Sequence, residues 1–274
     1  MPQAAADRHM RTESRTAGAA PGARDGALLE ALHADAGVVC MVGAGGKKST
    51  MYRLALAHPG RVAVTATVHI PLFPDWVDAA PVVTDQAVLE ATVLAQAGGR
   101  RRLAYATLTD KPGRYGGVAA QTVERLHAAA GFDLTLVKAD GARRRLLKGP
   151  GGRDPIVPAG VATVIAVVSA QVAGRPLDQR TVHYQDHVTA LTGVARGEIL
   201  TPRHVAQTLA AYLQGAWLPD GARVVPLVNM AEDRRSRGAG EGIAAALLEL
   251  LPRVQRVVIA HMAGDDPLVG VVER

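Results

Sequence analysis

Aromatic residues, cysteine and long apolar runs are scarce in this sequence, and each shortage excludes a class of protein. Aromatic residues make up 3% of the 274 residues, too few for the stacking platforms of proteins that bind single-stranded nucleic acid. Cys40 is the single cysteine, so no disulfide forms within one chain, as is usual in a reducing cytoplasm. No apolar run approaches the ~18 residues of a membrane-spanning helix. We therefore expect a cytoplasmic protein without a membrane segment.

The formal net charge of +6 would suit nucleic acid, but the positive residues lie in short clusters without aromatic residues between them. We interpret the clusters at 100–102 and 234–237 as solvated loops. The cluster at 143–148 adjoins the candidate site described below. Nucleic acid is therefore not the partner that we expect, although a basic nucleic-acid-associated protein stays a third hypothesis.

The most informative segment covers residues 38–50. Residues 38–42 are apolar and predict a buried strand, residues 43–46 form a glycine-rich turn, and two lysines and two hydroxyl residues then open a helix. Glycines let backbone N–H groups surround an anion, and the helix N-terminus adds a partial positive charge. A lysine reaches the terminal phosphates, and a hydroxyl can hold Mg²⁺. We predict a site for Mg²⁺ with ATP or GTP, formed by Gly43, Ala44, Gly45, Gly46, Lys47, Lys48, Ser49 and Thr50.

The match to the phosphate-loop pattern G-x-x-x-x-G-K-[ST] is imperfect. With Lys47 as the phosphate lysine, Gly46 precedes it correctly, but Lys48 replaces the hydroxyl residue. With Lys48 as the phosphate lysine, Ser49 follows correctly, but Lys47 replaces the glycine. A dinucleotide-binding G-x-G-x-x-G pattern fits less well, because Lys48 stands where the third glycine packs the helix on the strand. A glycine turn with a solvated lysine pair is the simplest alternative.

Strand and helix patterns alternate along most of the chain, which is typical of a parallel sheet covered on both faces. We expect strands at 38–42, 61–67, 82–83, 103–108, 133–137, 161–168, 223–228 and 254–260. We expect helices at 25–36, from the loop to about 58, and at 86–97, 118–130, 186–191, 204–213 and 242–250. The predicted fold is α/β and P-loop-NTPase-like, a mostly parallel sheet with helices on both faces, in one domain over 26–274. Residues 1–25 lack the apolar region of a secretory signal and are predicted to be a disordered tail.

An acidic residue follows the predicted strand at 133–137. An NTPase needs such a residue to orient Mg²⁺ opposite the phosphate loop. Asp140 has this position, and the carboxyl ends of parallel strands meet at one sheet edge, where it could reach Lys47 and Ser49. We predict Lys47 and Asp140 as catalytic residues and Ser49, Thr50 and Asp140 as Mg²⁺ ligands. A simple Asp-Gly turn is the alternative.

Further candidates lie at the ends of other predicted elements. Thr67 and His69 follow the second strand, where they could face the γ-phosphate or its water, and we count His69 among the catalytic residues; alternatively, threonine simply suits a strand. Arg143 is a candidate phosphate ligand because guanidinium groups bind phosphate in a bidentate manner. The sequence does not distinguish it from the other arginines of 143–145, and a solvated surface position is the alternative.

Residues 229–233 follow the expected strand at 223–228. GTPases have an Asn-Lys-x-Asp motif in such a position, where it recognises guanine. Asn229, Glu232 and Asp233 are candidates for base contact, but Met230 replaces the lysine, which leaves the base open. His183 and His187 are four residues apart, as on one helix face. With no third His or Cys nearby in the sequence, they form only a weak zinc motif.

Taken together, these residues resemble the YqeC family of accessory proteins for selenium-dependent molybdenum hydroxylases. The resemblance rests on the segments 42–50, 65–70, 138–148, 182–193 and 228–233. It implies a P-loop-like NTPase fold and a role in maturing molybdenum hydroxylases that carry a labile selenium-containing cofactor. Family members commonly have a hydroxyl residue directly after the loop lysine, and Lys48 departs from that pattern.

The leading hypothesis is an NTP hydrolase whose turnover drives a conformational step on a client, a molybdenum hydroxylase or its cofactor. The second hypothesis is a carrier that uses the loop for an anionic group, such as a pterin phosphate, without hydrolysis.

Overall fold

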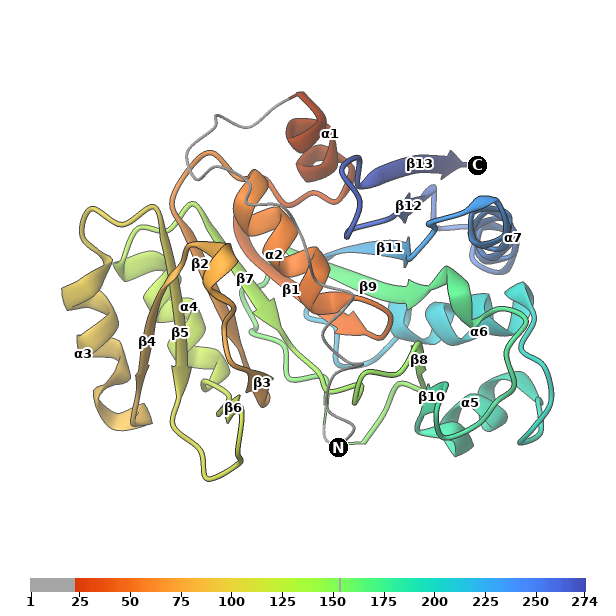
Figure 1. Ribbon diagram of the computed structural model, residues 1–274, viewed down its shortest axis with the longest axis horizontal. Coiled ribbons are helices and arrows are strands. Elements are labelled where there is room, and N and C mark those ends of the chain that lie inside the picture. Colours follow the sequence, from red (N-terminus) through yellow and green to blue (C-terminus); the bar gives the residue numbers. More distant parts are fainter. Residues whose placement is uncertain (1–22, 153) are drawn as a thin grey trace, which may run out of the picture.

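The computed structural model describes residues 23–152 and 154–274 (Figure 1). Of the disordered tail predicted for residues 1–25, residues 1–22 lie outside the described residues. The first helix, α1 (Ala23–Ala31), begins before the expected boundary and ends earlier than expected. Within these two ranges, no helix has the length and apolar character needed to cross a membrane.

A nine-stranded sheet, counted over the described residues, forms the centre of the molecule, in the order β13-β12-β11-β9-β1-β7-β2-β5-β4. Its strands are β1 (Gly37–Gly43), β2 (Val62–Ala66), β4 (Ala80–Thr84), β5 (Arg102–Thr107), β7 (Leu134–Lys138), β9 (Thr163–Ser169), β11 (Arg223–Asn229), β12 (Arg256–Ala260) and β13 (Leu268–Glu273). All neighbouring pairs are parallel except β12 with β13. The carboxyl ends of the parallel strands therefore meet at one edge of the sheet.

Helices cover both faces of this sheet (Figure 1). The helices after α1 are α2 (Lys47–Ala57), α3 (Gln86–Ala97), α4 (Ala120–Ala129), α5 (Gln185–Thr192), α6 (Pro202–Leu213) and α7 (Arg234–Leu250). Side chains of α1 and α2 pack in one core with Val39 and Met41 of β1. Side chains of α3 to α7 pack in the other core with Val38, Cys40 and Val42. The predicted fold class, α/β with a mostly parallel sheet and helices on both faces, is confirmed.

The last long helix begins earlier than its glycine-rich sequence predicted. The cluster 234–237, interpreted above as a solvated loop, forms the first turn of α7 instead. Asp233 and Ser236 form a capping box there, with each side chain bonded to the other residue's backbone N–H. A Cβ on Gly240 would lie 3.3 Å from Cγ2 of Ile259, so the glycine permits close packing of the helix on β12. Capping and packing outweigh the low helix propensity of glycine here.

Two short strand pairs fold the loops at the carboxyl edge of the sheet, where no strands were expected. β3 (Ile70–Pro71) pairs with β6 (Arg114–Tyr115), which anchors the turn at 110–117 near the end of β2. β8 (Leu147–Lys148) pairs with β10 (Val182–His183) near the end of β7. The antiparallel edge strand β13 was also not expected. The two short pairs bring residues from distant segments to the site described next.

Candidate functional site

The loop between β1 and α2 depends on glycine. Gly43 and Gly46 have φ angles of +89° and +120°, a region that L side chains rarely adopt. A Cβ on Gly43 would lie 2.3 Å from the carbonyl oxygen of Val167 in β9. A Cβ on Gly46 would lie 2.0 Å from Nδ2 of Asn229. The loop is thus pressed against the ends of two neighbouring strands, which fixes its curvature.

The two lysines after the loop have different positions. Lys47 is the first residue of α2 and is 6% exposed. Its Nζ donates to the carbonyl oxygen of Gly43 and lies 2.8 Å from Oδ1 of Asp140. Lys48 is half-buried, and its Nζ has no hydrogen bond or ion pair within the described residues. Of the two registers that the sequence left open, the structure therefore has Lys47 inside the loop.

Asp140 follows β7 and is fully buried. Its Oδ2 accepts hydrogen bonds from the backbone N–H of Gly43 and from Nζ of Lys148, both at 2.9 Å. Lys148 Nζ also lies 2.6 Å from Oδ1 of Asp154, and Oδ2 of Asp154 accepts the N–H of Gly141 at 2.9 Å. The loop, the end of β7 and the segment after it are joined by two carboxylates and two lysines.

The other oxygen of Asp140 faces Lys47. Oδ1 of Asp140 lies 2.8 Å from Nζ of Lys47 in a buried ion pair. Burial alone would raise the pKa of Asp140, but the charges of Lys47 and Lys148 hold it below the usual range. Asp140 is therefore an ionised, buried carboxylate whose two oxygens face Lys47 and Lys148.

Sequence reasoning missed the roles of Lys148 and Asp154. Lys148 was noted only as part of a basic cluster, and Asp154 was not singled out. Both lie in 142–158, between the expected strands at 133–137 and 161–168, where the sequence has no core pattern. The segment alternates charged residues with glycine and proline, which was the signal available for a site. The same composition is typical of an ordinary surface turn.

Asn229 connects the loop to the far strands. Its Nδ2 donates to the carbonyl oxygen of Gly45 at 2.9 Å, and its Oδ1 accepts the N–H of Met262 at 3.1 Å. The other two base candidates have different neighbours. Glu232 is exposed and lies 3.9 Å from Nε2 of His261, and Asp233 caps α7. Of these three residues, the structure brings only Asn229 to the loop.

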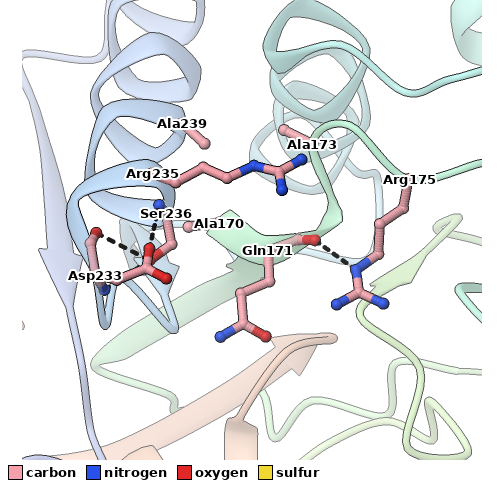
Figure 2. A pocket seen from close by; sticks show the side chains of 8 residues that line it. All are labelled: Ala170, Gln171, Ala173, Arg175, Asp233, Arg235, Ser236 and Ala239. Atoms are coloured by element: carbon pink, nitrogen blue, oxygen red, sulfur yellow. Dashed lines mark hydrogen bonds between the residues drawn. The ribbon is translucent and has the colours of Figure 1, made fainter.

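A cavity of about 340 Å³ lies beside this corner, between the 3-10 helix η2 (Ala170–Val172) and the start of α7. Figure 2 shows Arg175 and Arg235 approaching it from opposite sides, with Gln171 and Asp233 also lining it. η2 follows Ser169 directly, and a Cβ on Gly45 would lie 2.5 Å from the backbone nitrogen of Ser169. The cavity is thus linked to the loop through Ser169 at the end of β9, on the other side of β1 from β7 and Asp140.

The hydroxyl candidates and His69 lie at the same edge of the sheet. Ser49 is exposed, and Thr50 donates to the carbonyl oxygen of Gly46 at 3.1 Å. Thr67 donates to the carbonyl oxygen of Ile156 at 2.6 Å. His69 lies between β2 and β3, with its Nε2 3.3 Å from Oγ1 of Thr109.

The remaining candidates lie outside the loop. Arg143 is exposed, with a left-handed φ of 47°. His183 is in β10 and His187 is in α5, so the two do not share one helix face. His187 Nδ1 lies 2.8 Å from the carbonyl oxygen of Pro150. The part of the chain that the structure describes contains no group of three His, Cys, Asp or Glu side chains able to hold a metal.

Lys138, the last residue of β7, makes the stability of the protein depend on pH. Burial, with the nearby charge of Lys47, lowers the pKa of Lys138 to about 7. The unfolded chain keeps this proton to about pH 10. Between these values the unfolded state binds more protons, so the free energy of unfolding rises with pH. Relative to Lys138→Met, the unchanged protein should gain about 2 kcal/mol from pH 7 to pH 9 in urea unfolding. Equal pH dependence of the two proteins would contradict this pKa.

The sheet order around β1, the glycine loop and the buried Lys47–Asp140 pair define an α/β protein with a P-loop-NTPase-like fold. Comparison with known proteins gives the family. The family model described as "YqeC protein" matches residues 39–186, more than half of the chain. A protein of Escherichia coli (strain K12) named "Uncharacterized protein YqeC" is 28% identical over 200 residues, 70% of this chain and 75% of that protein. The chain belongs to the YqeC family, as the resemblance predicted.

Proposed function

We propose that this protein binds a nucleoside triphosphate with Mg²⁺ at the loop between β1 and α2 and hydrolyses it. The observation that carries the proposal is the ion pair between Lys47 and Asp140, 2.8 Å apart at the centre of a glycine loop. A lysine at the start of a helix and a carboxylate at the end of the neighbouring strand are the two charges that phosphoryl transfer needs at this place.

The residues present fit a triphosphate with its metal. The backbone of Gly43 to Gly46, the N-terminus of α2 and the ammonium group of Lys47 would hold the phosphates. Oδ1 of Asp140, which faces Lys47 and the loop, and the hydroxyl of Ser49 or Thr50 would hold Mg²⁺, directly or through water. When bound, Mg²⁺ would neutralise charge that develops on the phosphate oxygens.

Lys148 and Asp154 act as positioning residues in this proposal. Lys148 holds Oδ2 of Asp140, which leaves Oδ1 directed away from it. Burial and the charges of Lys111, Arg114 and Lys138 lower the pKa of His69, so its imidazole is neutral at pH 7. A neutral imidazole at the end of β2 is suited to accept a hydrogen bond from the attacking water.

The nucleoside would extend from the loop toward the cavity in Figure 2. Asn229 would support the loop through its hydrogen bond to the carbonyl oxygen of Gly45. The guanidinium groups of Arg175 and Arg235 are suited to stack on a base. Asp233 lines the same cavity. Because Met230 stands where guanine-reading motifs have lysine, ATP and GTP are both candidates.

The wider role that we propose rests on the family resemblance. Nucleotide hydrolysis would drive a conformational step during the maturation of a selenium-dependent molybdenum hydroxylase, acting on that enzyme or its cofactor. The name of the relative from Escherichia coli assigns no activity, so the support for this role is the family resemblance.

The first experiment is calorimetric titration with ATP, GTP and a non-hydrolysable analogue, with and without Mg²⁺. We expect binding of one triphosphate that depends on Mg²⁺. Binding of neither nucleotide would contradict the proposal and favour a carrier of another anionic group, such as a pterin phosphate.

The variant Asp140→Asn distinguishes an enzyme that hydrolyses the nucleotide from a protein that only binds it. In an NTPase, loss of this carboxylate should lower turnover by at least about 100-fold, because it removes a charge that acts on the reacting phosphate and its metal. A phosphate-release assay measures turnover, and thermal unfolding checks the fold, since Lys47 and Lys148 lose their partner. If the unchanged protein shows no turnover and the variant keeps full affinity, the protein is a carrier.

A further inference from the structure

A second cavity, of about 590 Å³, lies at the amino end of the parallel strands, on the edge of the sheet opposite the phosphate loop. The first residues of β11, Arg223 to Pro226, form one wall. The connections that lead into β11 and into β12 supply Leu218, Ala222 and residues 253–256. β11 and β12 are parallel neighbours, so both connections meet at this edge (Figure 1). The volume is within the range of about 300–1,000 Å³ that is usual for small-ligand sites.

Much of the lining of this cavity is apolar and continuous with the core. Leu218, Ala222, Val224 and Val254 are half-buried and pack against the core that contains side chains of α6 and α7. All four also line the cavity. Apolar surface that remains in contact with water costs free energy. A ligand with an apolar body would remove this surface from water.

Three arginines, Arg223, Arg253 and Arg256, line the same cavity, and no acidic side chain lines it among the described residues. Within residues 23–152 and 154–274, none of the three forms an ion pair. This includes Arg256 with Glu273, which lies opposite it in the register of β12 and β13. Like charges that share one cavity without a counter-charge repel one another. An anionic group on the ligand would supply the counter-charge.

Hydrogen bonds hold two of the arginines in place. Arg253 donates to the carbonyl oxygen of Leu213, at the end of α6, at 2.6 Å. Arg256 donates to Nε2 of His33, which also lines the cavity. Because a guanidinium group can only donate, the ring of His33 accepts through this nitrogen and is neutral. The side chain of Arg223 is exposed and has no hydrogen bond within the described ranges, so its donors remain available to a ligand.

We propose that this cavity binds a small amphiphilic anion, a molecule with an apolar body and a carboxylate or phosphate head. The body would lie against Leu218 and Val224, and the head would bind Arg223 and Arg256, because guanidinium groups match the oxygens of both heads.

The proposed anion site is separate from the nucleotide site. Asn229, which supports the phosphate loop, is the last residue of β11, whereas Arg223 is the first. Along a strand, this separation is about 20 Å. The proposal therefore does not depend on nucleotide binding, and it can be tested in protein without nucleotide.

The probe is anilinonaphthalene sulfonate, a dye with an apolar body and one anionic head, whose fluorescence rises in apolar surroundings. Phenylnaphthylamine has the same body without the sulfonate and is the matched neutral probe. Arg223→Gln combined with Arg256→Gln removes two cations, and Ala222→Phe fills the cavity. Arg100→Gln is the control, because Arg100 is exposed and precedes β5, which is separated from β11 by β9, β1, β7 and β2.

We expect one dye molecule to bind per chain. The double arginine variant should weaken this binding about 10-fold, which corresponds to about 1.4 kcal/mol. The neutral probe should bind more weakly than the dye and should not respond to loss of the arginines. Ala222→Phe should weaken the binding of both probes, and Arg100→Gln should weaken neither. Octanoate and octyl phosphate should displace the dye, and the stronger competitor identifies the preferred head.

Three results would overturn the site. The first is no saturable one-to-one binding of the dye, and the second is an equal loss with Arg100→Gln, which would indicate net charge alone. The third is a neutral probe that binds as tightly as the dye, which would leave the arginines without a role. An oligoglutamate peptide that displaces the dye more effectively than octanoate and octyl phosphate would replace the small ligand by an acidic segment of a partner protein. Thermal unfolding checks the fold of each variant, and if Ala222→Phe does not fold, the arginine variants and the neutral probe still decide.

Discussion

Lys47→Ala is expected to lower the affinity for nucleoside triphosphate by about 10- to 150-fold. A hydrogen bond from a buried ammonium group to phosphate contributes about 1.5–3 kcal/mol, and Lys47 is the lysine that lies within the loop. Calorimetric titration with the triphosphate that binds the unchanged protein measures the loss. Tight binding by the variant would contradict the proposed site.

The fold has to be checked in the same experiment, because Lys47→Ala leaves Asp140 with a single cation. Breaking a buried ion pair costs about 3–5 kcal/mol. A second variant, Lys47→Met combined with Asp140→Asn, removes both charges of the pair, so that no buried carboxylate loses a cation. It should also fail to bind nucleotide while retaining the circular dichroism spectrum of the unchanged protein. Arg100→Ala, a loss of positive charge at an exposed position, should bind normally.

Gly43→Ala is expected to lower the free energy of unfolding by about 2–5 kcal/mol and to abolish nucleotide binding. The φ of +89° costs an alanine about 1–2 kcal/mol. The new Cβ would also lie 2.3 Å from the backbone oxygen of Val167, which cannot move without disturbing the pairing of β1 with β9. Overpacking of this kind costs about 1–3 kcal/mol more. Urea unfolding measures the loss.

Gly98→Ala is the matched control. Gly98 follows α3 with a φ of −58°, and a Cβ there would have no atom within 4 Å. This variant should be as stable as the unchanged protein or more stable by up to about 1 kcal/mol, since alanine restricts the unfolded chain. If Gly43→Ala were as stable as Gly98→Ala, the loop would not be pressed against β9.

Much of the fold was predictable because its signals are local. The apolar run at 38–42, the glycines after it and the helical spacing beyond lie within a short stretch, and they correspond to β1, the loop and α2. The parallel sheet followed from the alternation of strand and helix patterns. Edge strand β13 and the two short strand pairs were not predicted, because each depends on a partner elsewhere in the chain.

The candidate site was predictable in part for the same reason. Asp140 was expected near Lys47 because parallel strands bring their carboxyl ends to one edge, and the two are 2.8 Å apart. The choice between Lys47 and Lys48 could not be made from the pattern, since either register breaks it at one position. It depends on the direction in which each side chain leaves α2, and that direction is set by the packing of the helix.

By itself, the sequence determined the order of the helices and of the parallel strands of the sheet, the glycine loop and the family, because periodicity and motif spacing are properties of neighbouring residues. The tertiary structure alone decided that Lys148 and Asp154 hold Asp140, and that Asn229 supports the loop. Each of these contacts joins residues whose local sequence reads as an ordinary turn or surface, so only the folded chain could show that they meet.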